Sequence, residues 1–132
     1  MRYFILTLSF LFLIFKPFYY AFAEWTMIDK SSDGVVNYVD LKNIGIGEKY
    51  IYVWDLRDEA KPVAGKYLSS SVLYEVDCNV PRAKTLTYVW YTGNMGIGKN
   101  KQEESVVKDW KYPTPATYMY SVLKSACKKI RD

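Results

Sequence analysis

Cys78 and Cys127 are the only two cysteines of this chain, and they are too far apart in sequence for a C-x-x-C redox motif. In an exported protein, an even pair of this kind is typical of a disulfide. Closing a loop of about 50 residues would stabilise the fold by roughly 4 kcal/mol on the chain-entropy model. Two buried free thiols are the alternative. A zinc site is not predicted, because the chain has no histidine and two isolated cysteines cannot complete a four-ligand shell.

The remaining inventory of reactive side chains argues against an enzyme. Without histidine, the chain lacks the commonest general base and the usual partner of a catalytic triad. There is no G-x-S-x-G motif and no P-loop, and the glycine-rich residues 93–98 lead into a charged loop rather than a phosphate-binding helix. Glu75 and Asp77 are two residues apart on one strand, which is more typical of a solvated edge than of a glycosidase pair. We therefore expect no catalytic residue and no cofactor.

Aromatic side chains are the remaining candidates for a binding function. Residues 24–132 contain ten tyrosines and the four tryptophans Trp25, Trp54, Trp90 and Trp110, which can stack on sugars or form a protein-binding patch. The alternative is that they fill the core, because all six phenylalanines precede residue 24. The mid-strand positions of Trp54 and Trp90 favour the core, and Tyr91 is expected to be more exposed.

Residues 1–23 have the three parts of a secretory signal peptide. Arg2 supplies the positive charge, thirteen uncharged residues separate it from Lys16, and Ala21 and Ala23 occupy the positions that a signal peptidase inspects. We predict cleavage after Ala23, which leaves residues 24–132 as a single domain. An uncleaved anchor is the alternative, but the uncharged run is shorter than the roughly 20 residues that span a bilayer.

The charge of the mature domain limits its partners. Arg2 and Lys16 are two of the 18 basic residues, so their removal lowers the net charge from +4 to +2. That value is too close to neutral to predict nucleic-acid or polybasic membrane binding. No cysteine follows the apolar run within the signal, so a stable membrane anchor is not expected after cleavage. We expect an exported protein of the periplasm or the cell surface, with a protein partner and with a homodimer as one candidate assembly.

Most of the mature chain is predicted to form strands separated by turns. Asp33-Gly34 indicates a hairpin with a type I′ turn, in which both central residues have positive φ. Residues 41–47 are expected to form a turn or a short helical excursion, and the charged residues 57–66 a loop. Strands rich in aromatic and β-branched residues are predicted over residues 25–29, 35–40, 50–56, 69–78 and 85–91, with a weaker strand near residues 105–108.

The last segment is predicted to be a helix that packs on the sheet. Thr114 is a suitable N-cap and Pro115 a suitable first helical residue, and the basic residues near the end are expected to be solvated. One apolar stripe contains Met119, Val122, Leu123, Ala126, Cys127 and Ile130. In the strand over residues 69–78, alternation places Val72, Tyr74, Val76 and Cys78 on one face and Ser71, Leu73, Glu75 and Asp77 on the other.

These assignments define the expected fold class. Each cysteine lies on the apolar side of its own element, so a single Cys78–Cys127 crosslink would tie the helix across the sheet. We predict an α+β fold: an antiparallel sheet of five to six strands with one C-terminal helix packed on one face and tied by a disulfide.

Several residues along the mature chain form a recognisable series. Its most specific element is the strand sequence YEVDC at residues 74–78, combined with the distant cysteine of the terminal helix. The other residues of the series are Trp25, Asp40, Trp54, Ser69 to Ser71, Arg82, Tyr91-Thr92-Gly93, Gly98, Trp110 and Pro113. This series resembles the surface-adhesin protein E-like family of Gram-negative bacteria.

This resemblance implies the same fold, the same disulfide and a periplasmic or surface location. The founding member of the family is an adhesin that binds host extracellular-matrix proteins and plasminogen. The resemblance therefore predicts a non-enzymatic, extracytoplasmic binding module. The alternative function is a periplasmic inhibitor or stability factor that acts on another envelope protein.

Overall fold

The structure is a computed structural model that describes residues 23–132. Residues 1–22 of the predicted signal peptide lie outside the described residues, so the structure does not test the signal-peptide prediction. Within the described part, no helix is both long and apolar enough to cross a membrane.

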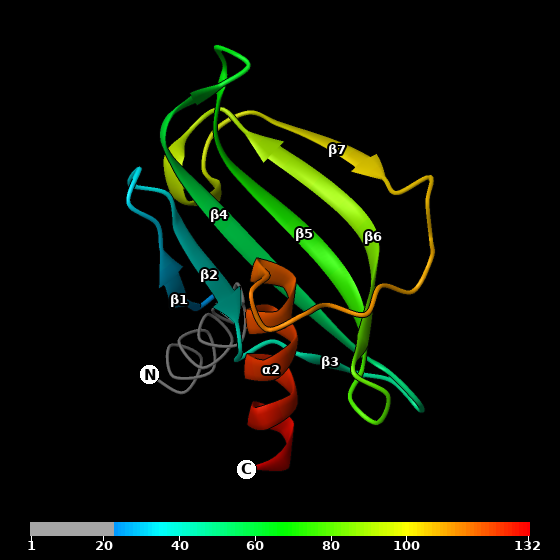
Figure 1. The fold of residues 1–132 in the computed structure, drawn as a ribbon. Helices are drawn as coiled ribbons and strands as arrows, with labels where there is room; N and C mark the ends of the chain where they lie inside the picture. Colours follow the sequence, from blue (N-terminus) through cyan, green and yellow to red (C-terminus); the bar gives the residue numbers. More distant parts are fainter. Residues whose placement is uncertain (1–22) are drawn as a thin grey trace, which may run out of the picture.

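One antiparallel sheet forms most of the fold, in the order β1-β2-β4-β5-β6-β7, with the short β3 paired to the start of β4 (Figure 1). The single long helix α2 packs across one face of this sheet. The predicted α+β architecture is therefore confirmed. The strands are β1 (Trp25–Lys30), β2 (Val36–Asp40), β3 (Gly45–Ile46), β4 (Ile51–Val63), β5 (Tyr67–Asp77), β6 (Arg82–Tyr91) and β7 (Asn100–Glu104); η1 (Asn94–Gly96) is a 3₁₀ turn and α2 spans Tyr118–Arg131.

The hairpin of β4 and β5 is longer than the sequence indicates. The loop predicted over residues 57–66 is wrong, because β4 continues to Val63 and only a tight turn with positive φ at Ala64 and Gly65 separates it from β5. Pairing with the serines of β5 continues through Asp58, and a shift of register before Val63 accommodates Pro62, which cannot donate a ladder hydrogen bond. Pairing with β5 thus overrides the weak preference of these charged residues for a loop.

Two other local predictions are corrected by backbone geometry. In the β1–β2 hairpin only Gly34 has positive φ, at 87°, so the turn is not type I′. The Gly34 N–H donates to the Ser31 carbonyl and the Ser31 N–H to the Val35 carbonyl, which makes a longer loop that needs one left-handed residue. Residues 41–47 contain the short strand β3 and no helical turn, because β3 finds a partner in β4.

The last strand lies earlier than predicted. We expected it near residues 105–108, whereas β7 spans Asn100–Glu104 and residues 105–108 are irregular. All five residues of β7 are exposed, so its position is determined by backbone pairing with β6 rather than by an apolar face. A hydrophobic pattern cannot reveal a strand of this kind.

Helix α2 begins three residues later than predicted. Its N-cap is Thr117 rather than Thr114, and the Thr117 hydroxyl accepts the N–H of Tyr120 at 3.3 Å. The carbonyl of Thr114 accepts the Thr117 N–H in the preceding turn, so Pro115 lies outside the helix. The apolar stripe buries Val122, Leu123, Ala126 and Cys127 but does not include Ile130, which is 41% exposed.

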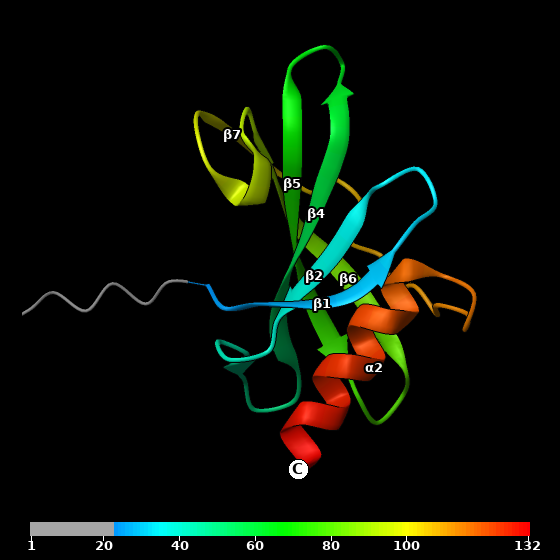
Figure 2. The ribbon, with the colours of Figure 1, turned by 90° about the vertical axis from the view of Figure 1, so that its left-hand side faces the viewer.

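The core lies between α2 and one face of the sheet (Figure 2). Val72, Tyr74 and Val76 of β5 contribute to it, as the predicted alternation requires. The Cys78–Cys127 disulfide is present, with a distance of 5.6 Å between the two Cα atoms. It joins the residue after β5 to the buried side of α2, so the prediction of a helix tied across the sheet is confirmed.

Candidate functional site

Three aromatic side chains form an uncovered row on the sheet face that also carries α2. Tyr88 of β6 pairs with Val72 of β5, and Val72 pairs with Asp55 of β4. Directly paired residues point to the same side of a sheet, so Tyr88 lies on the face that α2 covers at Asp55. Trp90 is two residues further along β6 on the same face. The Trp90 ring lies 5.6 Å from the Tyr88 ring and 6.5 Å from the Tyr67 ring, measured between centroids. We call Tyr67, Trp90 and Tyr88 the aromatic platform.

Charged side chains border the aromatic platform on both neighbouring strands. On β4, Arg57 and Glu59 form an ion pair at 2.5 Å. On β7, Lys101 and Glu103 form another at 2.6 Å, directly across from Trp90 and Tyr88. An aromatic centre with a polar border is the usual anatomy of a protein-binding surface.

A small hollow lies beside the platform. Its volume is about 40 Å³, and Glu59, Val63, Tyr67, Ser70 and Trp90 contribute to its walls. Small-molecule sites occupy several hundred Å³. The platform therefore suits one protruding side chain of a partner better than a whole small molecule.

The structure places neither Trp54 nor Trp90 in the core, so that prediction is wrong. Both side chains are half-buried. Trp54 lies on the face opposite α2, where its neighbour across the strand is Leu73, and Trp90 lies on the α2 face but in the aromatic platform. Valine is the most frequent buried apolar residue, and no tryptophan is fully buried among the described residues. Tyr91 is also half-buried rather than exposed, because it lies beside Gly96.

Trp110 is held in place by cations and is therefore a less suitable binding residue. The Arg82 guanidinium lies 4.3 Å and the Lys84 ammonium 4.4 Å from the centroid of its indole ring. The Tyr50 ring packs at 4.9 Å, and the neighbouring Lys111 forms two backbone hydrogen bonds with Ala83. These contacts explain why the irregular segment after β7 returns to the edge of the sheet.

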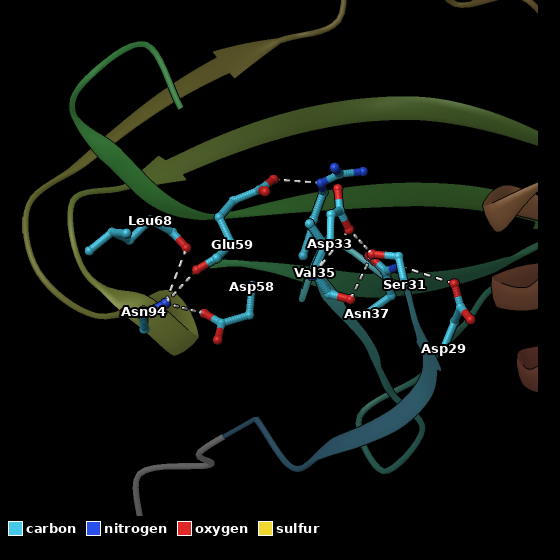
Figure 3. A network of polar contacts seen from close by, with 10 residues as sticks. Asp29, Ser31, Asp33, Val35, Asn37, Asp58, Glu59, Leu68 and Asn94 are labelled. Atoms are coloured by element: carbon cyan, nitrogen blue, oxygen red, sulfur yellow. Dashed lines mark hydrogen bonds and ion pairs between the residues drawn. The ribbon is translucent and has the colours of Figure 1, made fainter. Parts of the chain in front are cut away.

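The glycine-rich residues 93–98 form a plug on the β4–β5 hairpin, not a phosphate site. Met95 donates its N–H to the Asp58 carboxylate at 2.7 Å, and Gly96 donates to the Ser69 hydroxyl at 2.9 Å. The Asn94 amide donates to Asp58 and to the Glu59 carbonyl (Figure 3). Because these backbone N–H groups already have acceptors within the protein, the loop has few left to offer a phosphate.

The carboxylates of Glu75 and Asp77 are engaged in structural contacts. Glu75 accepts the Tyr52 hydroxyl at 2.9 Å and pairs with Lys84 at 3.1 Å. Asp77 accepts two N–H groups of the following turn and pairs with Arg82 at 3.1 Å. In residues 23–132 no group of three or more His, Cys, Asp or Glu side chains is arranged to hold a metal ion.

Asp55 is a buried acid that the sequence analysis did not single out. It is 1% exposed in the middle of β4, and its carboxylate accepts the Val72 N–H at 2.7 Å. Burial raises the pKa of Asp55 to about 7, although Val72, the hydroxyls of Tyr118 and Tyr74 and the charge of Arg57 act in the opposite direction. Burial also raises the pKa of Tyr74 well above its usual value. Tyr118 is the first residue of α2, so the charge state of Asp55 is linked to the packing of this helix on the sheet.

Comparison with known proteins places the chain in a family. The family model described as Surface-adhesin protein E matches residues 25–128, which is most of the chain. The chain belongs to the surface-adhesin protein E family. Membership of this adhesin family implies a protein-binding function and an exported, surface-located protein. No protein in the curated set matches the chain.

Solved structures of Haemophilus influenzae protein E share the fold of this family member. Crystal form II of protein E matches with a TM-score of 0.66 and 13% identity, over 89% of this chain and 98% of protein E. The selenomethionine form matches with a TM-score of 0.62 and 14% identity, over 86% and 93% of the two chains. Protein E from the non-typeable organism matches with a TM-score of 0.58 and 14% identity, over 86% and 82%. At these identities the likeness concerns the fold alone.

Proposed function

We propose that this member of the surface-adhesin protein E family is a non-enzymatic, exported binding module whose aromatic platform is the centre of its protein-binding face. The observation that supports the proposal most directly is the row of three aromatic rings beside α2, bordered by the ion pairs of β4 and β7. Aromatic side chains at the centre of an interface contribute much of its binding energy because they bury a large area at little cost in conformational entropy.

The proposed ligands are host extracellular-matrix proteins, in keeping with the adhesin family. The platform suits a partner that inserts one side chain beside Trp90 and makes hydrogen bonds to Arg57, Glu59, Lys101 and Glu103. The border contains equal numbers of positive and negative side chains, so it selects by geometry and hydrogen bonding rather than by net charge.

Trp90→Ala is expected to weaken binding to immobilised matrix proteins by at least about tenfold, as for an aromatic residue at the centre of an interface. Surface plasmon resonance against a panel of matrix proteins and plasminogen measures the change. Trp54→Ala is the matched control, since it removes the same half-buried side chain from the opposite face and should leave binding unchanged. If Trp54→Ala weakens binding and Trp90→Ala does not, the binding face is the other side of the sheet.

Export of the protein has its own test. Mass spectrometry of the protein recovered from cells should find a chain that begins at Glu24. Protease added to intact cells should then remove the protein if it is displayed on the surface. Full protection behind an intact outer membrane would contradict adhesion and favour action on another envelope protein. Recovery of the full-length chain from the cytosol would contradict export.

A further inference from the structure

The C-terminal end of α2 carries four cationic side chains beside one carboxylate side chain, that of Asp132. Lys124, Lys128, Lys129 and Arg131 are all exposed, and within residues 23–132 no ion pair links any of the four to a carboxylate. The helix dipole accounts for cations in the last turn, but Lys124 lies almost two turns before the end. The small net charge of the chain therefore conceals a concentration of positive charge at one place.

Exposed apolar side chains lie at the same end of the molecule. Ile130 in the last turn of α2 is 41% exposed, and Val80 in the turn between β5 and β6 is 47% exposed. Two views at right angles place the end of α2 and the β5–β6 turn at the same end of the fold (Figures 1 and 2). Cationic and aliphatic side chains are therefore exposed at the same end of the fold.

A cleft connects the helix to this turn. Its volume is about 300 Å³, and its walls are formed by the disulfide, Pro81, Tyr120, Leu123, Lys124 and Arg131. Tyr120, Lys124, Cys127 and Arg131 recur at helical spacing, so the cleft follows one side of α2 for about 16 Å. It thus combines apolar walls with two cations, the combination that suits an alkyl chain with an anionic head.

We propose that this helix-end surface, comprising Lys124, Lys128, Lys129, Ile130, Arg131 and Val80, docks reversibly on an anionic phospholipid bilayer. The cations contact the headgroup phosphates, and the aliphatic side chains enter the boundary between headgroups and acyl chains. The aromatic platform lies elsewhere on the fold and remains free for a protein partner. The proposal does not depend on the proposed adhesin function, because it uses different residues and a different ligand.

Vesicle co-sedimentation tests the proposal. The protein is expressed from its full sequence, recovered as processed by the cell, and mixed with vesicles of phosphatidylglycerol and phosphatidylethanolamine or of phosphatidylcholine alone. We expect binding to the anionic vesicles that weakens as salt is added, and little binding to phosphatidylcholine. The double variant Lys128→Glu/Lys129→Glu should bind the anionic vesicles at least about tenfold more weakly.

A matched control separates this surface from the effect of net charge. Lys61→Glu/Lys66→Glu makes the same charge change at the exposed tip of the β4–β5 hairpin, at the other end of the fold (Figure 1), and should retain binding. Equal weakening by the two double variants would overturn the proposal, as would absence of binding to anionic vesicles. Ile130→Ser/Val80→Ser should reduce the binding that persists at high salt. If it has no effect and soluble polyglutamate binds as tightly as the vesicles, the partner is an acidic protein and the proposal fails.

Discussion

Asp55→Asn is expected to stabilise the protein by about 4 kcal/mol above pH 7, an unusual outcome for a substitution in the core. The pKa of Asp55 is raised from 3.8 to about 7 by burial, so the folded protein binds this proton more tightly than the unfolded chain does. The contribution of Asp55 to stability therefore falls as the pH rises from about 4 to about 7, where the carboxylate becomes charged inside the core. Asparagine has nearly the same shape, can still accept the Val72 N–H, and carries no charge.

Urea unfolding of both proteins at several pH values between 5 and 8 measures this effect. The difference between the two free energies of unfolding should grow with pH and level off above about 7. Asp109→Asn is the control, because it neutralises an exposed carboxylate and should follow the wild type throughout. Parallel profiles for wild type and Asp55→Asn would show that Asp55 is not the source of the pH dependence.

Cys78→Ser is expected to lower the free energy of unfolding by roughly 2–5 kcal/mol, because it opens a covalent loop that joins α2 to the end of β5. The burial of Val122, Leu123 and Ala126 retains part of the helix packing, so the loss should not abolish the fold. Cys78 is the better position to change, since it is only half-buried, whereas a serine hydroxyl at Cys127 would be placed in the core.

Thermal and urea unfolding with and without reductant check this prediction. Reductant should lower the stability of the wild type to that of the variant and leave the variant unchanged. Hydrogen exchange should localise the loss to α2, whose amides should lose protection before those of β4 and β5. A variant that melts together with the non-reduced wild type would show that the crosslink contributes nothing to stability.

Local patterns in the sequence were enough to predict the fold class. The alternation of β5 assigned Val72, Tyr74 and Val76 to the face that α2 covers, because side chains of a strand point to opposite faces in turn. The apolar stripe of α2 identified Cys127 as a buried residue by the same kind of argument. The two cysteines had no other partner to choose, so the disulfide followed from their number and from the expected compartment.

The tertiary structure alone determined the candidate site. Tyr67, Tyr88 and Trp90 become neighbours through the register of β5 and β6 and the extension of β4, none of which has a local signal in the sequence. The polar strand β7 is likewise a consequence of pairing, and it brings Lys101 and Glu103 to the border of the platform. Trp90 was assigned to the core because its position in mid-strand does not show which part of the sheet the helix leaves uncovered.

Charge and burial depend on the fold for the same physical reason. Composition indicated a protein close to neutral, although the sequence already places four cations within residues 124–131. Only folding leaves their side chains exposed and brings the β5–β6 turn to the same end of the molecule (Figures 1 and 2). Asp55 is one acid among fourteen in the sequence, and only the packing of α2 over β4 removes it from water. A residue type and its local pattern are properties of the sequence, whereas exposure and pKa depend on neighbours that are distant along the chain.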